Sequence, residues 1–201
     1  TLPSPAELEA CAAKVGWDKV RLSERRVHLP LPGMELDFGG VVKEYAADAA
    51  ARRARDAGIR HGLVSLGGDI RVVGAQADGR PWPVGIVHPR RTGSAIAELS
   101  LSEGAVATSG GYERFVEIEG RRYSHLIDPR TGWPVDGLLS VSVVAQAAVV
   151  AGSIASAALL RPQADALDWL ETCGAPYLAV DTKLGCHGHF VPVSSGSIPT
   201  K

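Results

Sequence analysis

Hydrophobic and polar residues alternate along much of this chain with a period of two, which is typical of half-buried β-strands. The alternating runs are short, and residues of the Gly, Pro and Ser types separate them. We expect strands at residues 19–22, 26–31, 62–66, 70–74, 82–87, 97–101, 105–107, 115–119, 121–123, 139–145, 177–180 and 186–191. Their close succession in the middle of the chain predicts a meander of β-structure.

Four other segments have the spacing or the boundary residues of helices. Ser4 and Pro5 are typical of a helix start, so the first helix is expected from Pro5 to about Val15. The other three are expected at residues 41–57, 147–160 and 162–173. The chain therefore predicts an α+β fold with a mixed or antiparallel sheet and flanking helices. We expect one domain over residues 1–193 and a flexible tail over residues 194–201.

The helix expected at residues 41–57 has an apolar and a charged face. The residues expected to be buried recur at three- and four-residue spacing and are Val42, Tyr45, Ala46, Ala49 and Ala50. The residues expected to face water are Arg52, Arg53 and Arg55.

Charge and cysteine content narrow the class of protein. The 201 residues carry 21 basic and 22 acidic side chains, so no basic field favours nucleic acid. No apolar run is long enough for a membrane span, and the compartment stays open. The three cysteines lie far apart without a CxxC pair, which argues against a zinc site or a disulfide framework. Small molecules or proteins are therefore the expected partners.

Four turns rich in glycine or hydroxyl residues interrupt the predicted elements, at Asp37 to Gly40, Leu66 to Asp69, Thr108 to Gly111 and Asp128 to Gly132. Two glycines before a helix let a phosphate approach free N–H groups at the positive end of the helix dipole. Each turn taken alone also has a structural explanation, as a tight strand-to-helix turn, a bulge or a hairpin bend. Four in one domain favour a ligand site.

The segment around the last turn has the highest density of side chains that could take part in catalysis. Within the nine residues from Ser124 to Gly132 lie a hydroxyl, the His125 imidazole and the Asp128 carboxylate. Imidazole titrates near neutral pH and is suited to a general base. The plain alternative is a hairpin in which His125 is a satisfied buried histidine and Asp128 starts a turn.

The order and spacing of these motifs resemble those of the ApbE family, flavin transferases that move FMN from FAD onto a protein threonine or serine. The matching stretches are DFGGVVKEYAAD from Asp37, LGGDI from Leu66, ATSG from Ala107 and SHLIDPRTG from Ser124. The resemblance covers nearly all of Pro5 to Val180, and the Ser124 stretch is its most specific part.

The resemblance implies an α+β fold related to the T-fold that binds FAD in a cleft with Mg²⁺ beside the pyrophosphate. The residues that it implies for FAD are Gly39, Gly40, Lys43, Gly67, Gly68, Asp69, Thr108, Ser109, Gly110, His125, Ile127, Asp128 and Thr131. It implies His125 as the catalytic base, with Asp128 either orienting the imidazole or capping the turn. The metal positions that it implies are the Val42 backbone, Gly152 and Ser156.

The sequence departs from the family at the implied metal site. Gly152 stands where the family has an aspartate, and glycine offers no carboxylate to a hard cation. Glycine inside a helix costs about 1 kcal/mol relative to alanine, so the sequence gives no structural reason for it. Val42 and Glu44 replace a family alanine and glycine, and Glu44 restores a carboxylate near the Gly-Gly turn. The resemblance also implies an N-terminal segment in family members, before the region of Pro5, that this sequence does not include.

Three functions therefore compete. The first is an Mg²⁺-dependent FAD:protein FMN transferase that modifies a threonine or serine of an acceptor flavoprotein and releases AMP. The second is a non-catalytic protein of the same fold that binds FAD or another nucleotide and has a degenerate metal site. The third is a structural or interaction domain. A Rossmann dehydrogenase is disfavoured because no G-x-G-x-x-G motif is present, and a hydrolase because Ser109 lacks a G-x-S-x-G motif.

Overall fold

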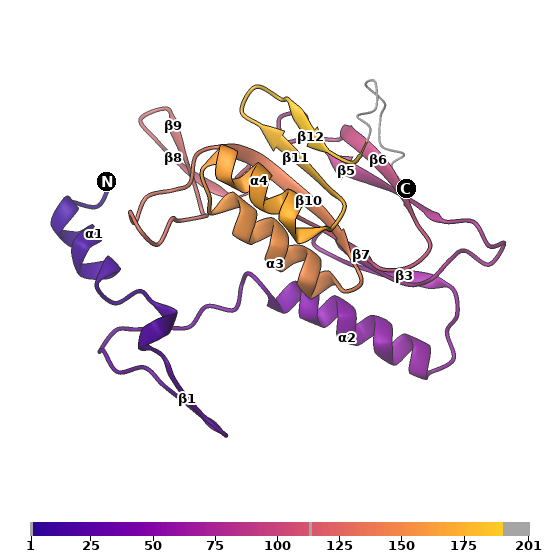
Figure 1. The fold of residues 1–201 in the computed structure, drawn as a ribbon, viewed down its shortest axis with the longest axis horizontal. Coiled ribbons are helices and arrows are strands. Elements are labelled where there is room, and N and C mark those ends of the chain that lie inside the picture. The colour runs from indigo at the N-terminus through magenta and orange to yellow at the C-terminus, as the bar shows by residue number, and fades with distance from the viewer. Residues whose placement is uncertain (1, 113, 191–201) are drawn as a thin grey trace.

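One antiparallel sheet of six strands forms the centre of the molecule (Figure 1). The computed structural model describes residues 2–112 and 114–190. The strands, in spatial order, are β12 (Cys186–Gly188), β11 (Tyr177–Asp181), β10 (Leu138–Ala145), β7 (Ala105–Gly110), β4 (Asp69–Gly74) and β3 (Gly62–Leu66). This spatial order follows the chain order, so the predicted α+β fold with a meander is confirmed. The predicted tail and the last residue of the predicted final strand lie outside the described residues.

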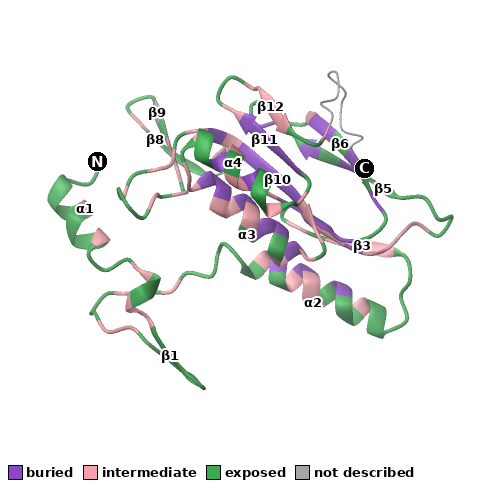
Figure 2. Cartoon of the chain, viewed as in Figure 1, coloured by how far each residue is buried: buried purple, intermediate pink, exposed green. Residues whose placement is uncertain are grey.

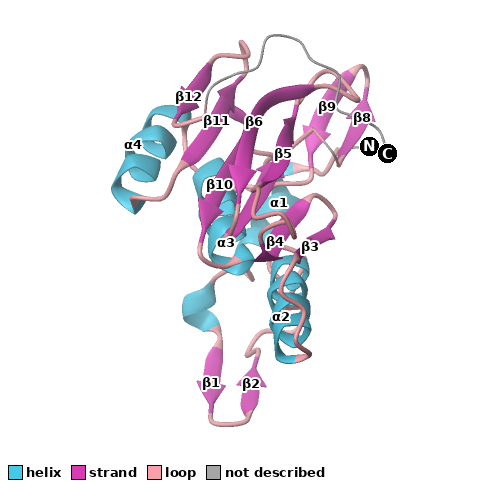
Figure 3. Ribbon diagram, turned by 90° about the vertical axis from the view of Figure 1, so that its right-hand side faces the viewer, coloured by secondary structure: helices cyan, strands magenta, loops and turns pink. Residues whose placement is uncertain are grey.

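Three excursions leave the sheet between consecutive strands. They are the hairpin β5 (Trp82–Val87) with β6 (Ala95–Leu101), the hairpin β8 (Phe115–Ile118) with β9 (Arg121–Ser124), and the helix pair α3 (Ala148–Leu159) with α4 (Gln163–Cys173). Figure 3 shows α3 and α4 on one face of the sheet and β5–β6 across the other. Both faces of the central strands are therefore covered.

Alternation along the strands builds a core on each face. Tyr177 and Ala179 of β11 pack with α3 and α4, whereas Leu178 and Val180 pack with the β5–β6 hairpin. Because successive side chains point to opposite faces of a strand, one apolar run serves both cores. The buried residues in Figure 2 accordingly concentrate in β10, β11 and α3.

Helix α2 (Val42–Asp56) presents a different face to the sheet from the one that its apolar residues predict. The predicted face is wrong in part, because Val42 is 53% and Tyr45 64% exposed. The residues of α2 that are buried are Glu44, Ala47 and Ala51. Ala47 packs against Ala105 and Ala148, where only a small side chain lets the helix approach the sheet and α3. The predicted exposure of Arg52, Arg53 and Arg55 is confirmed.

The N-terminal part of the chain extends along one side of the sheet domain (Figure 1). It holds α1 (Pro5–Ala12), a 3₁₀ turn (Trp17–Lys19) and the hairpin β1 (Arg21–Ser23) with β2 (Arg26–His28). The Ser4 N-cap is confirmed, because the Ser4 hydroxyl accepts a hydrogen bond from the Glu7 N–H. Helix α1 ends at Ala12, three residues before the predicted end, and none of its residues is buried. No helix in the described ranges is long and apolar enough to cross a membrane.

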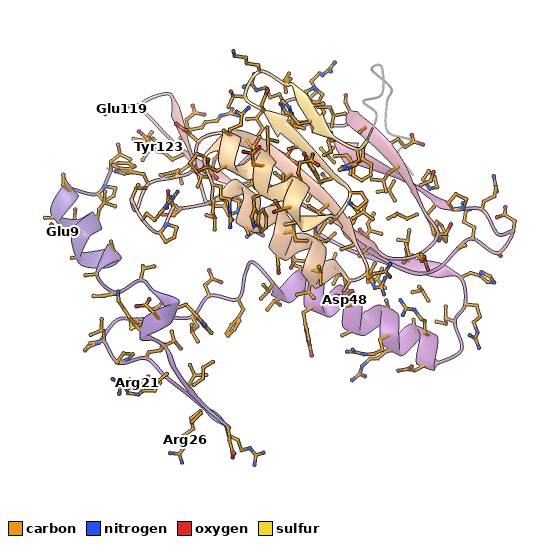
Figure 4. All side chains as sticks on the ribbon, in the orientation of Figure 1. Glu9, Arg21, Arg26, Asp48, Glu119 and Tyr123 are labelled. Carbon is orange, nitrogen blue, oxygen red and sulfur yellow. The ribbon has the colours of Figure 1, made fainter. Side chains whose placement is uncertain are left out.

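A carboxylate of α2 caps α3, nearly a hundred residues further along the chain. Ala147, at the N-cap of α3, makes no side-chain capping bond. Instead Asp48 accepts hydrogen bonds from the N–H groups of Ala148 at 2.9 Å and Val149 at 3.0 Å. Arg71 of β4 forms an ion pair with the same carboxylate, with 3.1 Å between Nε and Oδ1. Figure 4 labels Asp48 on α2. One side chain thus fixes the positions of two helices and a strand.

We expect Asp48→Ala to lower the free energy of unfolding by about 1–3 kcal/mol, because it leaves two N–H groups at the helix start unpaired and removes the partner of Arg71. Denaturant unfolding measures this loss. Asp56→Ala, in the last turn of α2, is the matched control and should be neutral, because its carboxylate is exposed at the negative end of the helix. Equal effects of the two substitutions would contradict the capping role.

Candidate functional site

Asp69, in the second predicted turn, contacts the third turn and the helix that follows the first turn. The residue is 1% exposed, and its carboxylate accepts hydrogen bonds from Lys43 Nζ at 2.8 Å and from the Thr108 N–H at 3.1 Å. It therefore connects the β3–β4 turn to the first turn of α2 and to the end of β7. Gly67 lies beside this pair, since a Cβ at Gly67 would be 3.4 Å from Lys43 Cδ. Gly39 and Gly40 precede α2, where the Gly39 N–H donates to Asp37 Oδ1 at 2.7 Å.

Hydroxyl pairs extend this site from β7 to β10 and α3. Thr108 Oγ1 lies 2.8 Å from Ser142 Oγ, and Ser109 Oγ lies 2.8 Å from Ser156 Oγ. Ser156 is one of the implied metal positions, and its contact with Ser109 places that position beside the implied FAD residues. We call this assembly of the α2 N-terminus, the β3–β4 turn, the β7 end and the middle of α3 the phosphate-side cluster.

Glu44 fills the space in front of Gly152. A Cβ built on Gly152 would lie 2.8 Å from both Cγ and Oε1 of Glu44. Any larger residue at position 152 would therefore require Glu44 to move. The sequence suggested no structural reason for a glycine in α3, and this expectation is wrong, because Glu44 needs the room. An implied metal position at Gly152 thus corresponds to a place where the Glu44 carboxylate stands.

The electrostatic setting of Glu44 is unfavourable for an isolated carboxylate. Glu44 is 5% exposed, and its Oε2 is buried without a hydrogen-bond partner among the described residues. Burial raises the pKa of Glu44, a hydrogen bond from its own backbone N–H and the charge of Lys43 lower it, and the Asp69 carboxylate raises it through its charge and a hydrogen bond. Buried charges in proteins are normally paired or bound to a metal, so this carboxylate calls for an explanation.

The position of the fourth turn is set by contacts of the loop that follows β9. A Cβ on Gly111 would lie 2.6 Å from Ser124 Oγ, so this loop sits against the end of β7. Leu126 packs on the core formed by α3 and β10. The loop therefore brings His125 next to the segment that also carries Thr108 and Ser109.

His125 is exposed, and the proton on its ring can be located from its contacts. Nδ1 lies 3.0 Å from the carbonyl oxygen of Arg114. Because a carbonyl only accepts hydrogen bonds, the neutral imidazole carries its proton on Nδ1. Its Nε2 then has a free lone pair and no partner among the described residues. This tautomer is the one that a general base needs.

Asp128 binds Arg130 and caps its own turn. Its carboxylate accepts from the Arg130 N–H at 2.9 Å and from Arg130 Nη2 at 2.8 Å, and Arg130 lowers the pKa of Asp128. Among the described residues it makes no hydrogen bond to His125. Of the two roles left open by the sequence, these contacts are those of a turn cap. Ile127 is exposed, and Thr131 Oγ1 accepts from the Trp133 N–H; within the described ranges neither side chain is hydrogen-bonded to the phosphate-side cluster.

A cavity of about 700 Å³ opens beside the loop, at the base of the β8–β9 hairpin. Its walls include Gly111, Tyr112, Phe115, Tyr123, Ser124 and Trp133. None of the residues implied for FAD lines it, although it borders two of their segments through Gly111 and Ser124. The sequence left open which aromatic residue meets a ligand, and Tyr112, Tyr123 and Trp133 all line this one cavity; Figure 4 labels Tyr123.

Comparison with known proteins agrees with this architecture. Chains with the same arrangement include the ApbE protein of Thermotoga maritima, with a TM-score of 0.87 and 32% identity over 94% of this chain and 62% of that one. The flavin transferase ApbE of Vibrio cholerae matches with a TM-score of 0.78 and 27% identity over 94% of this chain and 61% of that one. The fold is thus of the ApbE-like α+β class.

Sequence comparison gives the family. The profile of the ApbE family matches residues 1–178. The FAD:protein FMN transferase of Salmonella typhimurium is 37% identical over 156 residues, which cover 75% of this chain and 45% of that protein. The corresponding protein of Haemophilus influenzae is 30% identical over 203 residues, covering 97% of this chain and 58% of its own length. The chain belongs to the ApbE family, and it spans about half the length of these relatives.

Glu44→Gln should stabilise the metal-free protein, by about 1–3 kcal/mol near neutral pH, because it replaces a buried carboxylate, beside Asp69 and with Oε2 unbonded among the described residues, by a neutral amide of the same shape. The pKa of Glu44 is raised in the folded protein, so the favourable protonated form is fully present at low pH and is lost as pH rises through that pKa. The difference between variant and native chain should therefore grow with pH.

Denaturant unfolding in EDTA at several pH values between acid and neutral measures this difference. Glu9→Gln, on the exposed helix α1, is the control and should leave the pH profile unchanged. A native chain that is as stable as the Glu44→Gln variant at every pH would show that Glu44 has a protein partner.

Proposed function

We propose that this chain is an FAD:protein FMN transferase that attaches FMN from FAD to a threonine or serine of an acceptor flavoprotein. The observation that carries the proposal is His125, whose Nδ1 contact with the Arg114 carbonyl leaves Nε2 as the basic nitrogen, on a segment that adjoins the end of β7 through Ser124 and Gly111. Relatives named FAD:protein FMN transferase support the same reaction.

The FAD diphosphate would bind between the Gly39-Gly40 turn and the end of β7. The N-terminus of α2 carries a partial positive charge, and Lys43, paired with Asp69, lies beside the turn at Gly67 and Gly68. The flat flavin ring would enter the aromatic cavity lined by Tyr112, Tyr123 and Trp133. Residues 1–193 would act as one FAD-binding domain in this arrangement.

The transfer would proceed by attack of the acceptor hydroxyl on the phosphorus of the FMN half. His125 Nε2 takes the hydroxyl proton, the new P–O bond joins FMN to the acceptor, and the P–O bond to AMP breaks. General-base assistance of this kind contributes about 10²–10⁴-fold. The contacts of Asp128 with Arg130 keep the loop that carries His125 folded.

Mg²⁺ fits this site only as an ion shared with phosphate. No group of three or more His, Cys, Asp or Glu residues in the described ranges could hold a metal ion. Mg²⁺ commonly binds one or two carboxylates together with substrate phosphates and water, and the Ser156 hydroxyl, the Val42 carbonyl and nearby carboxylates suit that mode. When bound, the ion would neutralise the diphosphate and stabilise AMP as it leaves.

The second candidate is a protein that binds FAD without transferring FMN. The occupied space at Gly152 favours it, because the family carboxylate is missing from α3. The two candidates differ in AMP release from FAD, which only the transferase catalyses.

His125→Ala should reduce AMP release from FAD, in the presence of MgCl₂ and acceptor, by about 10²–10⁴-fold. FAD affinity, followed by flavin fluorescence, should change little because the imidazole is exposed and holds no phosphate-side residue. His61→Ala is the matched control, since His61 Nδ1 also contacts a carbonyl, that of Ala75 at 2.9 Å, near the other end of α2. Unchanged AMP release by His125→Ala would overturn the role of His125, and none by the native chain would favour the second candidate.

A further inference from the structure

Helices α2 and α3 meet in an antiparallel register that places Glu44 opposite Gly152. Asp48, one turn after Glu44, contacts the start of α3 at Ala148, and Glu44 contacts Gly152, one turn after Ala148. Residues four apart lie on the same face of a helix, so both contacts belong to one seam. Along it, Asp48 has two N–H partners, whereas Glu44 Oε2 has none among the described residues.

Both residues of the Glu44–Gly152 contact are costly when considered alone. A glycine inside a helix costs about 1 kcal/mol relative to alanine. A buried polar group without a partner costs about 1–3 kcal/mol. Because a Cβ at position 152 would overlap Glu44, the glycine leaves room for the carboxylate in its present position. The remaining question is what the carboxylate does there.

Oxygen atoms of the kind that a hard cation prefers lie near Glu44, together with the ammonium group of Lys43. The Asp69 carboxylate is one of these neighbours, and its two oxygens accept hydrogen bonds from Lys43 Nζ and the Thr108 N–H. Ser156, four residues after Gly152, brings a hydroxyl to the same face of α3, next to Ser109. Two carboxylates and hydroxyls are too few for a complete coordination sphere. Phosphate oxygens and water would have to complete it, as they commonly do for Mg²⁺.

We propose that Glu44 is a ligand of the divalent metal ion in this chain, its carboxylate reaching from α2 into the space that a carboxylate on α3 would occupy if position 152 carried one. The inference deepens the proposed function, on which it rests. With Glu44 as a ligand, Gly152 does not mark a lost metal site. The site instead takes its carboxylate from α2, the helix that faces position 152.

A relocated ligand predicts that the carboxylate can be moved back. Glu44→Ala/Gly152→Asp removes the carboxylate from α2 and supplies one from α3, and it also relieves the overlap because the Glu44 side chain is gone. Gly152→Asp alone should be poorly stable, since its Cβ would meet Glu44 Cγ and Oε1 at 2.8 Å and two carboxylates would share one space. Glu44→Gln should fold at least as well as the native chain.

The experiment measures ADP binding by calorimetry in MgCl₂ and in EDTA, with ADP as a diphosphate probe from which FMN cannot be transferred. For the native chain and for the exposed control Glu9→Gln, Mg²⁺ should strengthen ADP binding by about tenfold or more. Glu44→Gln should lose this enhancement while retaining the affinity measured in EDTA. The double variant Glu44→Ala/Gly152→Asp should regain it.

An unchanged Mg²⁺ enhancement in Glu44→Gln would overturn the proposal, and so would the absence of any enhancement in the native chain. Failure of the double variant to regain it, with thermal unfolding showing a folded protein, would also count against a shared position. The proposed function is tested separately by AMP release. A Glu44-dependent Mg²⁺ effect without AMP release would leave the metal ligand in place and overturn the transferase.

Discussion

The seam between α2 and α3 is the contact on which the site depends. Asp48 and Glu44 lie on the same face of α2, and both project carboxylates toward α3. The first satisfies the N–H groups at the start of α3 and so fixes the register of the two helices. That register determines that Glu44 meets Gly152. Consecutive turns of α2 thus carry Asp48, whose carboxylate caps α3, and Glu44, whose Oε2 has no hydrogen-bond partner among the described residues.

The central sheet connects the α2–α3 contact to the other residues of the site. Asp69 at the start of β4 binds Lys43 of α2 and the backbone of Thr108, while Ser109 reaches Ser156 on α3. The end of β7 therefore contacts the β3–β4 turn and α3, and the loop of His125 rests against the residue that follows this strand. Distant segments of the chain converge because β4, β7 and β10 are neighbours in one antiparallel sheet.

Elements defined by local patterns could be predicted from the sequence, and contacts between elements could not. The strands, the Ser4 cap and the order of the four turns follow from alternation, capping residues and glycine. The prediction of the buried face of α2 was wrong because the small Ala47 and Ala51, rather than Val42 and Tyr45, permit close packing on the sheet. The reason for Gly152 could not be predicted either, because it is the volume of Glu44, more than a hundred residues earlier. From the sequence, Asp128 could either orient His125 or cap its turn, and only its contact with Arg130 in the structure distinguishes the two roles.

The most direct measurement of the central claim is the anomalous scattering of Mn²⁺ in crystals of this chain grown with ADP. If Glu44 is a metal ligand, we expect one strong peak at the α2–α3 seam, with Glu44 Oε2 at a coordination distance of about 2.1 Å and with phosphate oxygens among the other ligands. A manganese ion bound elsewhere, or bound at the seam with Glu44 turned away from it, would contradict this role of Glu44.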